Sequence, residues 1–269
     1  MINHLVGICP TLERQDLVRQ MVASYLAVST SPPAPMVVVA SGAEDGTEGW
    51  CQNQAKANGV PLTVLRSVEP LCYAKAVNAG VKHALAAHPE TQVLLLLNND
   101  LVIQPGFFEA LAEMFSFGYD IVGAKLLYPP GHPKEGTIQH CGKWFTLDQR
   151  SFHVGRWQPA DFPQSMRPVA YPDVTFACVA IKRTVWEGVG GLDEGYTNGW
   201  EDDDFCMKAR EGGAQIGVHP GVLAWHGEAS TTGMDNENKA RMFQRFSSIW
   251  IETGRIQLPL GLFLGYANP

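Results

Sequence analysis

Short apolar runs alternate with helix-like segments over the first hundred residues, and this alternation constrains the fold most strongly. The runs cover residues 4–8, 36–40, 62–65 and 93–97. Between 17 and 26, and again between 74 and 85, apolar side chains recur at helical spacing. Strands separated by helices predict parallel pairing with right-handed crossovers. The sequence therefore predicts an α/β fold, a Rossmann-like, mostly parallel sheet flanked by helices.

The first crossover carries two more specific predictions. Pro10 is expected to end the first strand, because proline has no backbone N–H to donate to a neighbouring strand. Thr11 is a common helix-capping residue, so we expect it to cap the helix over residues 17–26.

A polar triplet follows the fourth run directly, where the sequence reads LLLLNND. The four leucines predict a strand that is buried on both faces. Asn98, Asn99 and Asp100 then lie at its carboxyl end. Ligands of open α/β sheets bind outside the carboxyl ends of the strands. The triplet therefore predicts a binding site.

The alternation breaks after about residue 105. Residues 107–115 predict a further helix, residues 128–170 are rich in loops, and 174–183 predict another strand. We expect one domain over 1–269, with a nucleotide-type half of about 1–105 and a variable half of about 106–269. The loop region contains five residues that are expected either to stack on sugars or to pack: Tyr128, His140, Trp144, His153 and Trp157.

An acidic cluster reads EDDDF from residue 201. Asp202 shares one helical face with Phe205 and Cys206, so it is expected in the first turn of a helix that looks inward. The helix dipole keeps a carboxylate ionised there, which suits a general base. The alternative is an acidic first turn that only stabilises the helix.

Two further pairs of residues could bind ligands. Asp100 and His226, if they meet, form a reasonable site for Mn²⁺ or Mg²⁺, although a lone histidine is often structural. Lys75 and a neighbouring amide begin the third helix, where an anion could bind, unless the lysine is simply solvated.

Composition excludes several classes. The net charge of −7 without a basic stripe argues against a nucleic-acid partner. The chain has neither a P-loop nor a GxGxxG motif after the first strand. The six cysteines form no CxxC pair, which predicts buried thiols in a reducing compartment. No stretch is long enough for a transmembrane segment. The apolar tail at 258–266 is expected to pack on its own domain, or else to contact a membrane surface or a partner.

Seven motifs in order resemble the family 2 glycosyltransferases of the GT-A fold, in particular the rhamnosyltransferase-like branch. The motifs are DGT (45–47), KAVNAG (75–80), LLLLNND (94–100), GTIQHCG (136–142), VGGLDEGY (189–196), WEDDDFCMKAREGG (200–213) and WHGEAS (225–230). The resemblance covers the chain from Val6 to about Thr232.

The resemblance implies a role for each matching position. Asp202 would be the catalytic base, and Asp100 and His226 would hold a divalent cation, Mn²⁺ or Mg²⁺. The donor would be bound by Pro10, Thr11, Ser41, Asp45, Lys75, Asn78, Asn98, Asn99 and Asp100. The acceptor would be bound in the second half, by Asp193, Glu194, Trp200 and Glu201.

One position departs from the family pattern. The family usually has an aspartate after the second strand that contacts the nucleotide base, whereas this chain reads VVVASGAEDGT, with Ala40 or Ser41 there. Either Asp45 substitutes for it or the donor carries thymidine or another base.

The resemblance implies an inverting, metal-dependent enzyme. It would transfer a hexosyl or deoxyhexosyl group from a UDP- or dTDP-type sugar to a hydroxyl of a glycan or another acceptor, in bacterial-type glycan synthesis. The expected location is the cytoplasm or the inner face of the membrane, with peripheral contact only. Two alternatives remain open: a sugar-nucleotide nucleotidyltransferase, and a non-catalytic glycan- or nucleotide-binding module on the same fold.

Overall fold

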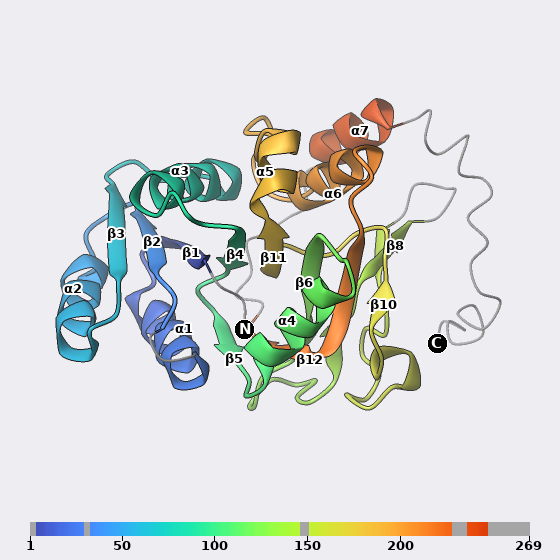
Figure 1. Ribbon diagram of the computed structural model, residues 1–269, viewed down its shortest axis with the longest axis horizontal. Coiled ribbons are helices and arrows are strands. Elements are labelled where there is room, and N and C mark those ends of the chain that lie inside the picture. The colour runs from blue at the N-terminus through green and yellow to red at the C-terminus, as the bar shows by residue number, and fades with distance from the viewer. Residues whose placement is uncertain (1–3, 30–32, 146–150, 228–235, 247–269) are drawn as a thin grey trace.

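A computed structural model describes residues 4–29, 33–145, 151–227 and 236–246 of the protein (Figure 1). The elements in chain order are β1 (Leu5–Leu12), α1 (Gln15–Val28), β2 (Met36–Ser41), α2 (Thr47–Asn58), β3 (Leu62–Ser67), α3 (Tyr73–Ala87), β4 (Val93–Leu97), β5 (Leu101–Ile103), α4 (Phe107–Ser116), β6 (Ile121–Leu127), β7 (Ile138–His140), β8 (Lys143–Phe145), β9 (Ser151–His153), a 3₁₀ turn η1 (Pro163–Ser165), β10 (Val169–Ala170), β11 (Cys178–Lys182), α5 (Arg183–Val189), α6 (Glu201–Glu211), β12 (Ile216–His226) and α7 (Asn236–Arg245).

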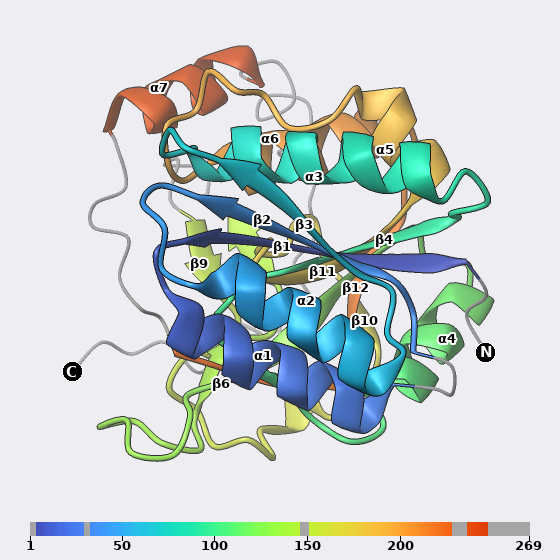
Figure 2. The same cartoon turned by 90° about the vertical axis from the view of Figure 1, so that its left-hand side faces the viewer.

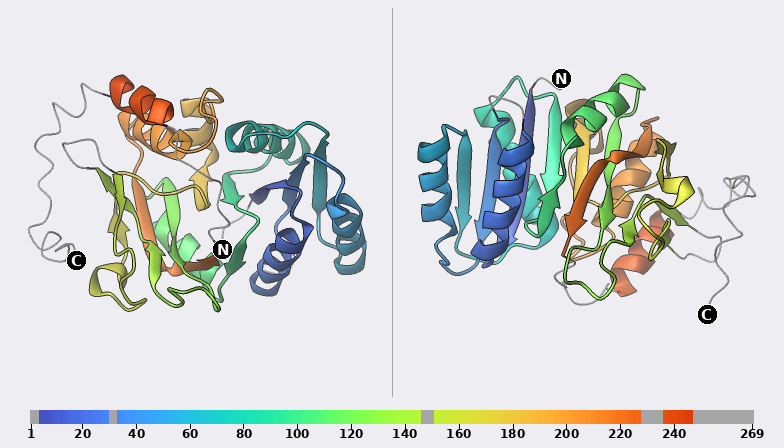
Figure 3. Two further views of the ribbon diagram at one scale, coloured as in Figure 1. Left: turned by 180° about the vertical axis from the view of Figure 1, so that it is seen from behind. Right: turned by 90° about the horizontal axis from the view of Figure 1, so that it is seen from below.

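One mixed, mostly parallel sheet runs through the described residues. Its order is β10-β12-β6-β11-β4-β1-β2-β3, with β5 paired to β12 and β7 paired to β6. The first four strands are mutually parallel, as predicted. β11 is antiparallel to both of its neighbours, β4 and β6, and so joins the two halves of the chain in one sheet. Figure 3 shows both halves side by side from behind and from below.

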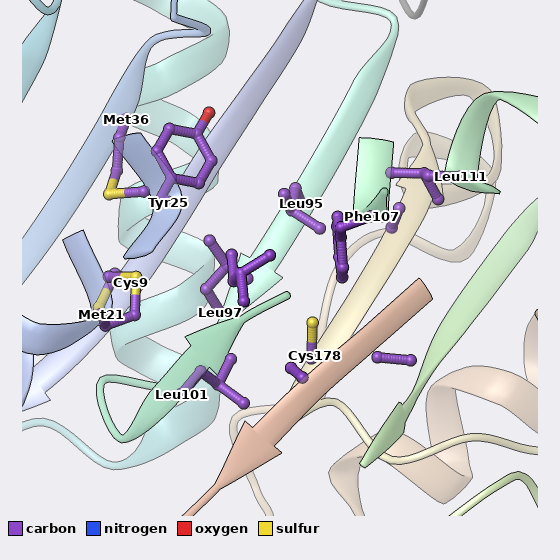
Figure 4. Close-up of a cluster of buried hydrophobic side chains, with 14 of the residues drawn as sticks. Cys9, Met21, Tyr25, Met36, Leu95, Leu97, Leu101, Phe107, Leu111 and Cys178 are labelled. Atoms are coloured by element: carbon purple, nitrogen blue, oxygen red, sulfur yellow. The ribbon is translucent and has the colours of Figure 1, made fainter. Parts of the chain in front are cut away.

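Helices cover both faces of this sheet (Figure 2). One core lies between the sheet and α1, α2 and α4, and the other lies beneath α3, α5 and α6. The leucines of β4 explain this arrangement, because they alternate between the faces. Leu95 and Leu97 enter the first core, next to Met21 of α1 (Figure 4). Leu94 and Leu96 enter the second. β4 is therefore buried on both faces, as predicted.

The prediction that Pro10 ends the first strand is wrong. β1 continues to Leu12 and stays paired with β2 up to Ser41. The N–H of Gly7 points to the β2 side, where it donates to Pro35 O, so alternation turns the nitrogen of Pro10 to the β4 side. Pairing with β4 ends at Ile8, and the missing N–H therefore breaks no ladder hydrogen bond.

The predicted capping role of Thr11 is wrong as well. Thr11 lies inside β1, and α1 begins after Arg14 without a cap from that side chain. Asp45 supplies the acceptor instead, because its Oδ2 receives the N–H of Gln15 at 2.9 Å. Its other oxygen, Oδ1, receives the N–H of Thr47 at 3.0 Å. One carboxylate thus serves the first turns of both α1 and α2.

All six cysteines lie in the described residues and are free thiols. Five are buried, and Cys72 is half-buried. No helix among the described residues combines the length and apolarity needed to cross a bilayer. The apolar tail at 258–266 lies outside the described residues, as do residues 228–232 at the end of the family resemblance.

Candidate active site

A cleft of about 790 Å³ opens at the carboxyl ends of β1, β2 and β4. Its walls also include the start of α3, the segment before β11, the start of α6 and the end of β12. Nine of the residues implied by the family resemblance line this cleft: Pro10, Thr11, Ser41, Asn98, Asn99, Asp100, Glu201, Asp202 and His226. Residues as far apart as 11 and 226 in the sequence therefore share one cavity.

Asp100 and His226 meet in this cleft. The Oδ1 of Asp100 lies 3.2 Å from Nε2 of His226, and both side chains are largely buried. The antiparallel pairing of β5 with β12 brings them together, since His226 lies opposite Leu101. Behind the ring, Oε1 of Gln139 lies 2.6 Å from Nδ1 of His226.

The Gln139 contact bears on whether a cation fits here. The carbonyl oxygen of Gln139 can only accept, so Nδ1 of His226 donates to it, and Nε2 is the ring nitrogen that faces Asp100. A proton on Nε2, or a metal ion between the two atoms, makes this 3.2 Å contact favourable. A carboxylate oxygen and a neutral imidazole nitrogen suit Mn²⁺, and Mg²⁺ to a lesser degree. The pair therefore fits a divalent cation, although two ligands alone do not make a complete shell.

The two amides of the triplet brace the neighbouring strand ends. Nδ2 of Asn99 donates to Oγ1 of Thr11 at 2.9 Å. The backbone N–H of Asn98 donates to Ala177 O, and its Nδ2 lies 3.4 Å from Nε2 of His226. The triplet thus ties β4 to β1, to the segment before β11 and to β12, and it holds Asp100 in place.

Asp202 lies in the first turn of α6, on a face shared with the buried Phe205 and Cys206, as predicted. Its Oδ2 lies 3.0 Å from Nζ of Lys143 and 3.4 Å from the N–H of Phe176. Its Oδ1 accepts the N–H of Asp203 at 2.9 Å. Burial alone would raise the pKa of Asp202, but these partners outweigh it and lower the pKa to about 2.

Glu201 lies beside Asp202 in the cleft and behaves differently. Burial, followed by the charge of Asp202, raises the pKa of Glu201 to about 7. Among the described residues, none forms a hydrogen bond with its buried Oε2. The cleft therefore holds one carboxylate that stays ionised and a neighbour that exchanges its proton near neutrality.

Three residues expected to bind the donor lie elsewhere. Asp45 is engaged with two backbone N–H groups, as described above, and is not among the residues that line the cleft. Lys75 is exposed on α3. Asn78 faces the loop before α6, where its Nδ2 donates to Leu192 O at 2.9 Å and its Oδ1 accepts the N–H of Leu192 at 2.9 Å.

The residues expected to bind the acceptor are also divided. Of these, only Glu201 lines the cleft. Asp193 pairs with Arg241 at 2.9 Å and Arg245 at 3.3 Å, both from α7. Glu194 accepts from Asn78 at 3.0 Å. Trp200 is buried behind the cleft wall against Phe243, with ring centroids 5.5 Å apart.

α7 supports the wall of the cleft next to α6 through these contacts. Nδ2 of its Asn238 lies 3.3 Å from Gly199 O and 3.4 Å from Asn198 O, and both residues line the cleft. Phe243 packs on Trp200, whose φ of +75° is unusual for a bulky residue. Backbone strain thus lies immediately before Glu201 and Asp202. Figure 1 shows α7 beside α6.

The loop-region aromatics mostly pack. Tyr128 is buried and stacks on His132 with ring centroids 4.4 Å apart, and His140 is fully buried. Trp144 packs edge-on against Tyr171, and His140 lies 3.0 Å from His153 between their Nδ1 atoms. Trp157 is the exposed exception.

Sequence reasoning missed Lys143, whose importance depends on tertiary contacts. It approaches Asp202 from β8, 59 residues earlier in the chain, and reaches Asp173 and Asp203 too. A single lysine in CGKWF carries no local signal of this role. The one sequence clue was the density of acids at 201–204, which exceeds what a helix start needs.

Two curated proteins are similar to this chain in sequence. An uncharacterized protein, y4gI of Sinorhizobium fredii, is 31% identical over 250 residues, covering 88% of this chain and 26% of the relative. The O-antigen biosynthesis protein RfbC of Myxococcus xanthus is 27% identical over 244 residues, covering 85% and 18%. The chain thus spans about a quarter or less of these two relatives.

The fold matches solved GT-A glycosyltransferases. GalNAc-T7, solved with UDP, GalNAc and Mn²⁺, superimposes with a TM-score of 0.69 at 15% identity, covering 89% of this chain and 47% of that one. The sequence profile described as "Glycosyltransferase like family 2" matches residues 5–245. This chain therefore belongs to glycosyltransferase family 2 and adopts the GT-A fold.

Proposed function

We propose that the chain is an inverting, metal-dependent glycosyltransferase that moves a sugar from a nucleotide-diphosphate sugar to an acceptor hydroxyl. The observation that supports this most is the shared cleft, in which Asp100 and His226 lie on one wall and Asp202 on another. Two sets of groups with opposite tasks, one for the leaving diphosphate and one for the attacking hydroxyl, can thus act on one substrate pair.

The donor is a UDP- or dTDP-type sugar in this proposal. Asp45 is engaged with backbone N–H groups, and the polar groups near the ends of β1 and β2 in the cleft include Ser41, Arg14 and the backbone around Thr11. A pyrimidine can be held by hydroxyl and backbone groups without a carboxylate. The name of RfbC, and the UDP in the GalNAc-T7 structure, support glycan synthesis with a nucleotide sugar.

Different residues of the chain have different roles in the proposed reaction. Asp100 and His226 would hold a divalent cation, which when bound offsets negative charge on the diphosphate. Asp202 accepts the proton of the acceptor hydroxyl while the oxygen of that hydroxyl forms a bond to the anomeric carbon. The bond from that carbon to the diphosphate oxygen breaks, and its electron pair leaves with the diphosphate. A single displacement inverts the configuration.

We further propose that the protein works in a reducing compartment, the cytoplasm, which the six free thiols support.

Replacing the Asp202 carboxylate tests this function directly. A thermal-shift panel of nucleotide diphosphates and their sugars, with and without Mn²⁺, first identifies the donor. Asp202→Asn is then expected to lower kcat by about two to four orders of magnitude, because a general base contributes that much. Nucleotide binding should persist, since the metal pair is untouched.

The control is Glu211→Gln, at the exposed far end of the same helix. It should keep wild-type turnover. Near-normal turnover by Asp202→Asn would refute the role of Asp202. Nucleotide binding without any sugar transfer by the wild type would instead support the non-catalytic module.

A further inference from the structure

Asp202 belongs to a buried cluster of one lysine and three carboxyl groups. Nζ of Lys143 is 3.0 Å from Asp202 Oδ2, 3.0 Å from Asp203 Oδ2 and 3.3 Å from Asp173 Oδ2. The Lys143 side chain is 5% exposed, Asp173 is 0% and Asp203 is 6%, whereas Asp202 is 15% exposed and reaches the cleft. The cluster thus connects the core to the candidate base.

The backbone fixes the lysine in this cluster. Lys143 forms an antiparallel bridge with Asp173, and its N–H donates to Asp173 O at 2.8 Å. It also pairs with His153 in the β8–β9 hairpin. Adjacent Gly142, at φ +98°, presses against Tyr171, which leaves no room for a side chain there. The ammonium is therefore delivered from a strand that cannot easily shift.

The cluster contains more carboxyl groups than one lysine can neutralise. One buried ammonium balances one carboxylate, and unpaired buried charge is very unfavourable. Burial raises the pKa of both Asp173 and Asp203, so protons neutralise part of the excess. The backbone N–H of Asp203 donates to Oδ1 of Asp202 at 2.9 Å, which favours the ionised form of Asp202 and lowers its pKa. The negative charge is therefore concentrated on the one carboxylate that faces the cleft.

We propose that Lys143 is a positioning residue that fixes the direction of the Asp202 carboxylate toward the acceptor hydroxyl. This inference rests on the proposed function. Lys143 and the N–H of Phe176 hold Oδ2 of Asp202, and the N–H of Asp203 holds Oδ1. With three donors on its two oxygens, the carboxylate cannot rotate freely, and one lone pair, on Oδ1, is left to accept a proton.

Several other titratable groups face Asp202, so more than one group contributes to the pH dependence of activity. Glu201 and Asp203 come from α6, Asp173 from the segment before β11, Tyr73 from α3 and His153 from β9. Burial raises the pKa of Glu201 to about 7, and it also raises the pKa of Asp173 and of Asp203. The titration of Asp202 is therefore followed at its own carboxyl carbon.

The test compares Lys143→Met with wild type and with Lys125→Met. Lys125 is a matched control, because it is also buried but donates to the carbonyls of Ala160 and Ser165 instead of to carboxylates. Lys143→Met is expected to bind the nucleotide identified by thermal shift as wild type does. Its kcat should fall about 100-fold, the usual consequence of a misplaced catalytic group. Lys125→Met should keep the wild-type kcat when activity is expressed per folded molecule.

A second measurement needs no turnover. Carboxyl ¹³C NMR titration should show the pKa of Asp202 in Lys143→Met about one to three pH units above wild type. An unchanged kcat together with an unchanged titration overturns the positioning role. Absence of sugar transfer by the wild type refutes the proposed function alone, since the titration still reports on Lys143.

Lys143→Arg keeps the test decisive if Lys143→Met does not fold. The guanidinium preserves the charge but changes the geometry. Nucleotide binding and the Asp202 titration should then match wild type while kcat falls at least tenfold. If kcat, binding and the titration all match wild type, the direction of the carboxylate does not depend on Lys143, and the inference fails.

Discussion

At the residue scale, Glu201 makes stability depend on pH. Its folded pKa of about 7 lies above its ordinary value of 4.5, so the folded protein binds this proton more tightly than the unfolded chain does. Stability from this site is therefore complete below about pH 4.5 and is lost as the pH rises through 7. When this contribution is lost completely, the free energy of unfolding falls by roughly 3 kcal/mol.

Glu201→Gln removes this dependence. Urea denaturation should show equal stability of the variant and wild type at pH 4.5. At pH 8 the variant should be more stable by up to about 3 kcal/mol. Equal stability of the two proteins at both pH values would show that the carboxyl group is not buried as described.

At the element scale, the fit of α3 onto the sheet depends on Gly80. A Cβ there would lie 2.7 Å from Cγ2 of Ile8 and 2.8 Å from Cγ2 of Val39. Gly80→Ala should therefore destabilise the protein by about 1–3 kcal/mol through overpacking. Gly49 in α2 has nothing within 4 Å of its Cβ position. Gly49→Ala should stabilise by about 0.5–1 kcal/mol, and urea unfolding distinguishes the two signs.

α7 is held to the molecule by two different forces that substitution can separate. Phe243 is buried with Trp200 and Met242, whereas the Arg241 side chain is 45% exposed where it meets Asp193. Phe243→Ala should destabilise by about 3–5 kcal/mol. Arg241→Ala should cost at most about 1 kcal/mol, because water screens the pair. Denaturation curves that gave the reverse order would show that charge, not packing, holds this helix.

At the scale of the whole molecule, local patterns predict more of the first half than of the second. The leucines of β4 reveal a strand buried on both faces, and helical spacing reveals α1 and α3, because these signals repeat every few residues. The reach of β1 past Pro10 was not predictable, since it depends on which neighbouring strand the nitrogen faces.

The residues of the candidate site also divide into those that local sequence patterns reveal and those that depend on tertiary contacts. Asn98 to Asp100, Asp202 and His226 could be found in sequence, because each stands at the end of an apolar run or the start of a helix. Lys143, Asp173 and the Trp200–Phe243 contact depend on segments that meet only after folding. Lys75 and Asn78 fit their motif, but whether a side chain on a helix faces a cleft or a neighbouring loop is decided by tertiary packing.

The position of β11 in the sheet has a consequence for synthesis on the ribosome. β4 is complete once residue 97 has been translated, yet its partner strand begins at residue 178. During the intervening synthesis, a leucine-rich strand edge stays unpaired, and such edges readily pair with other chains. The nascent chain therefore exposes an aggregation-prone edge between the synthesis of residue 97 and that of residue 178, and a chaperone would benefit it in this interval.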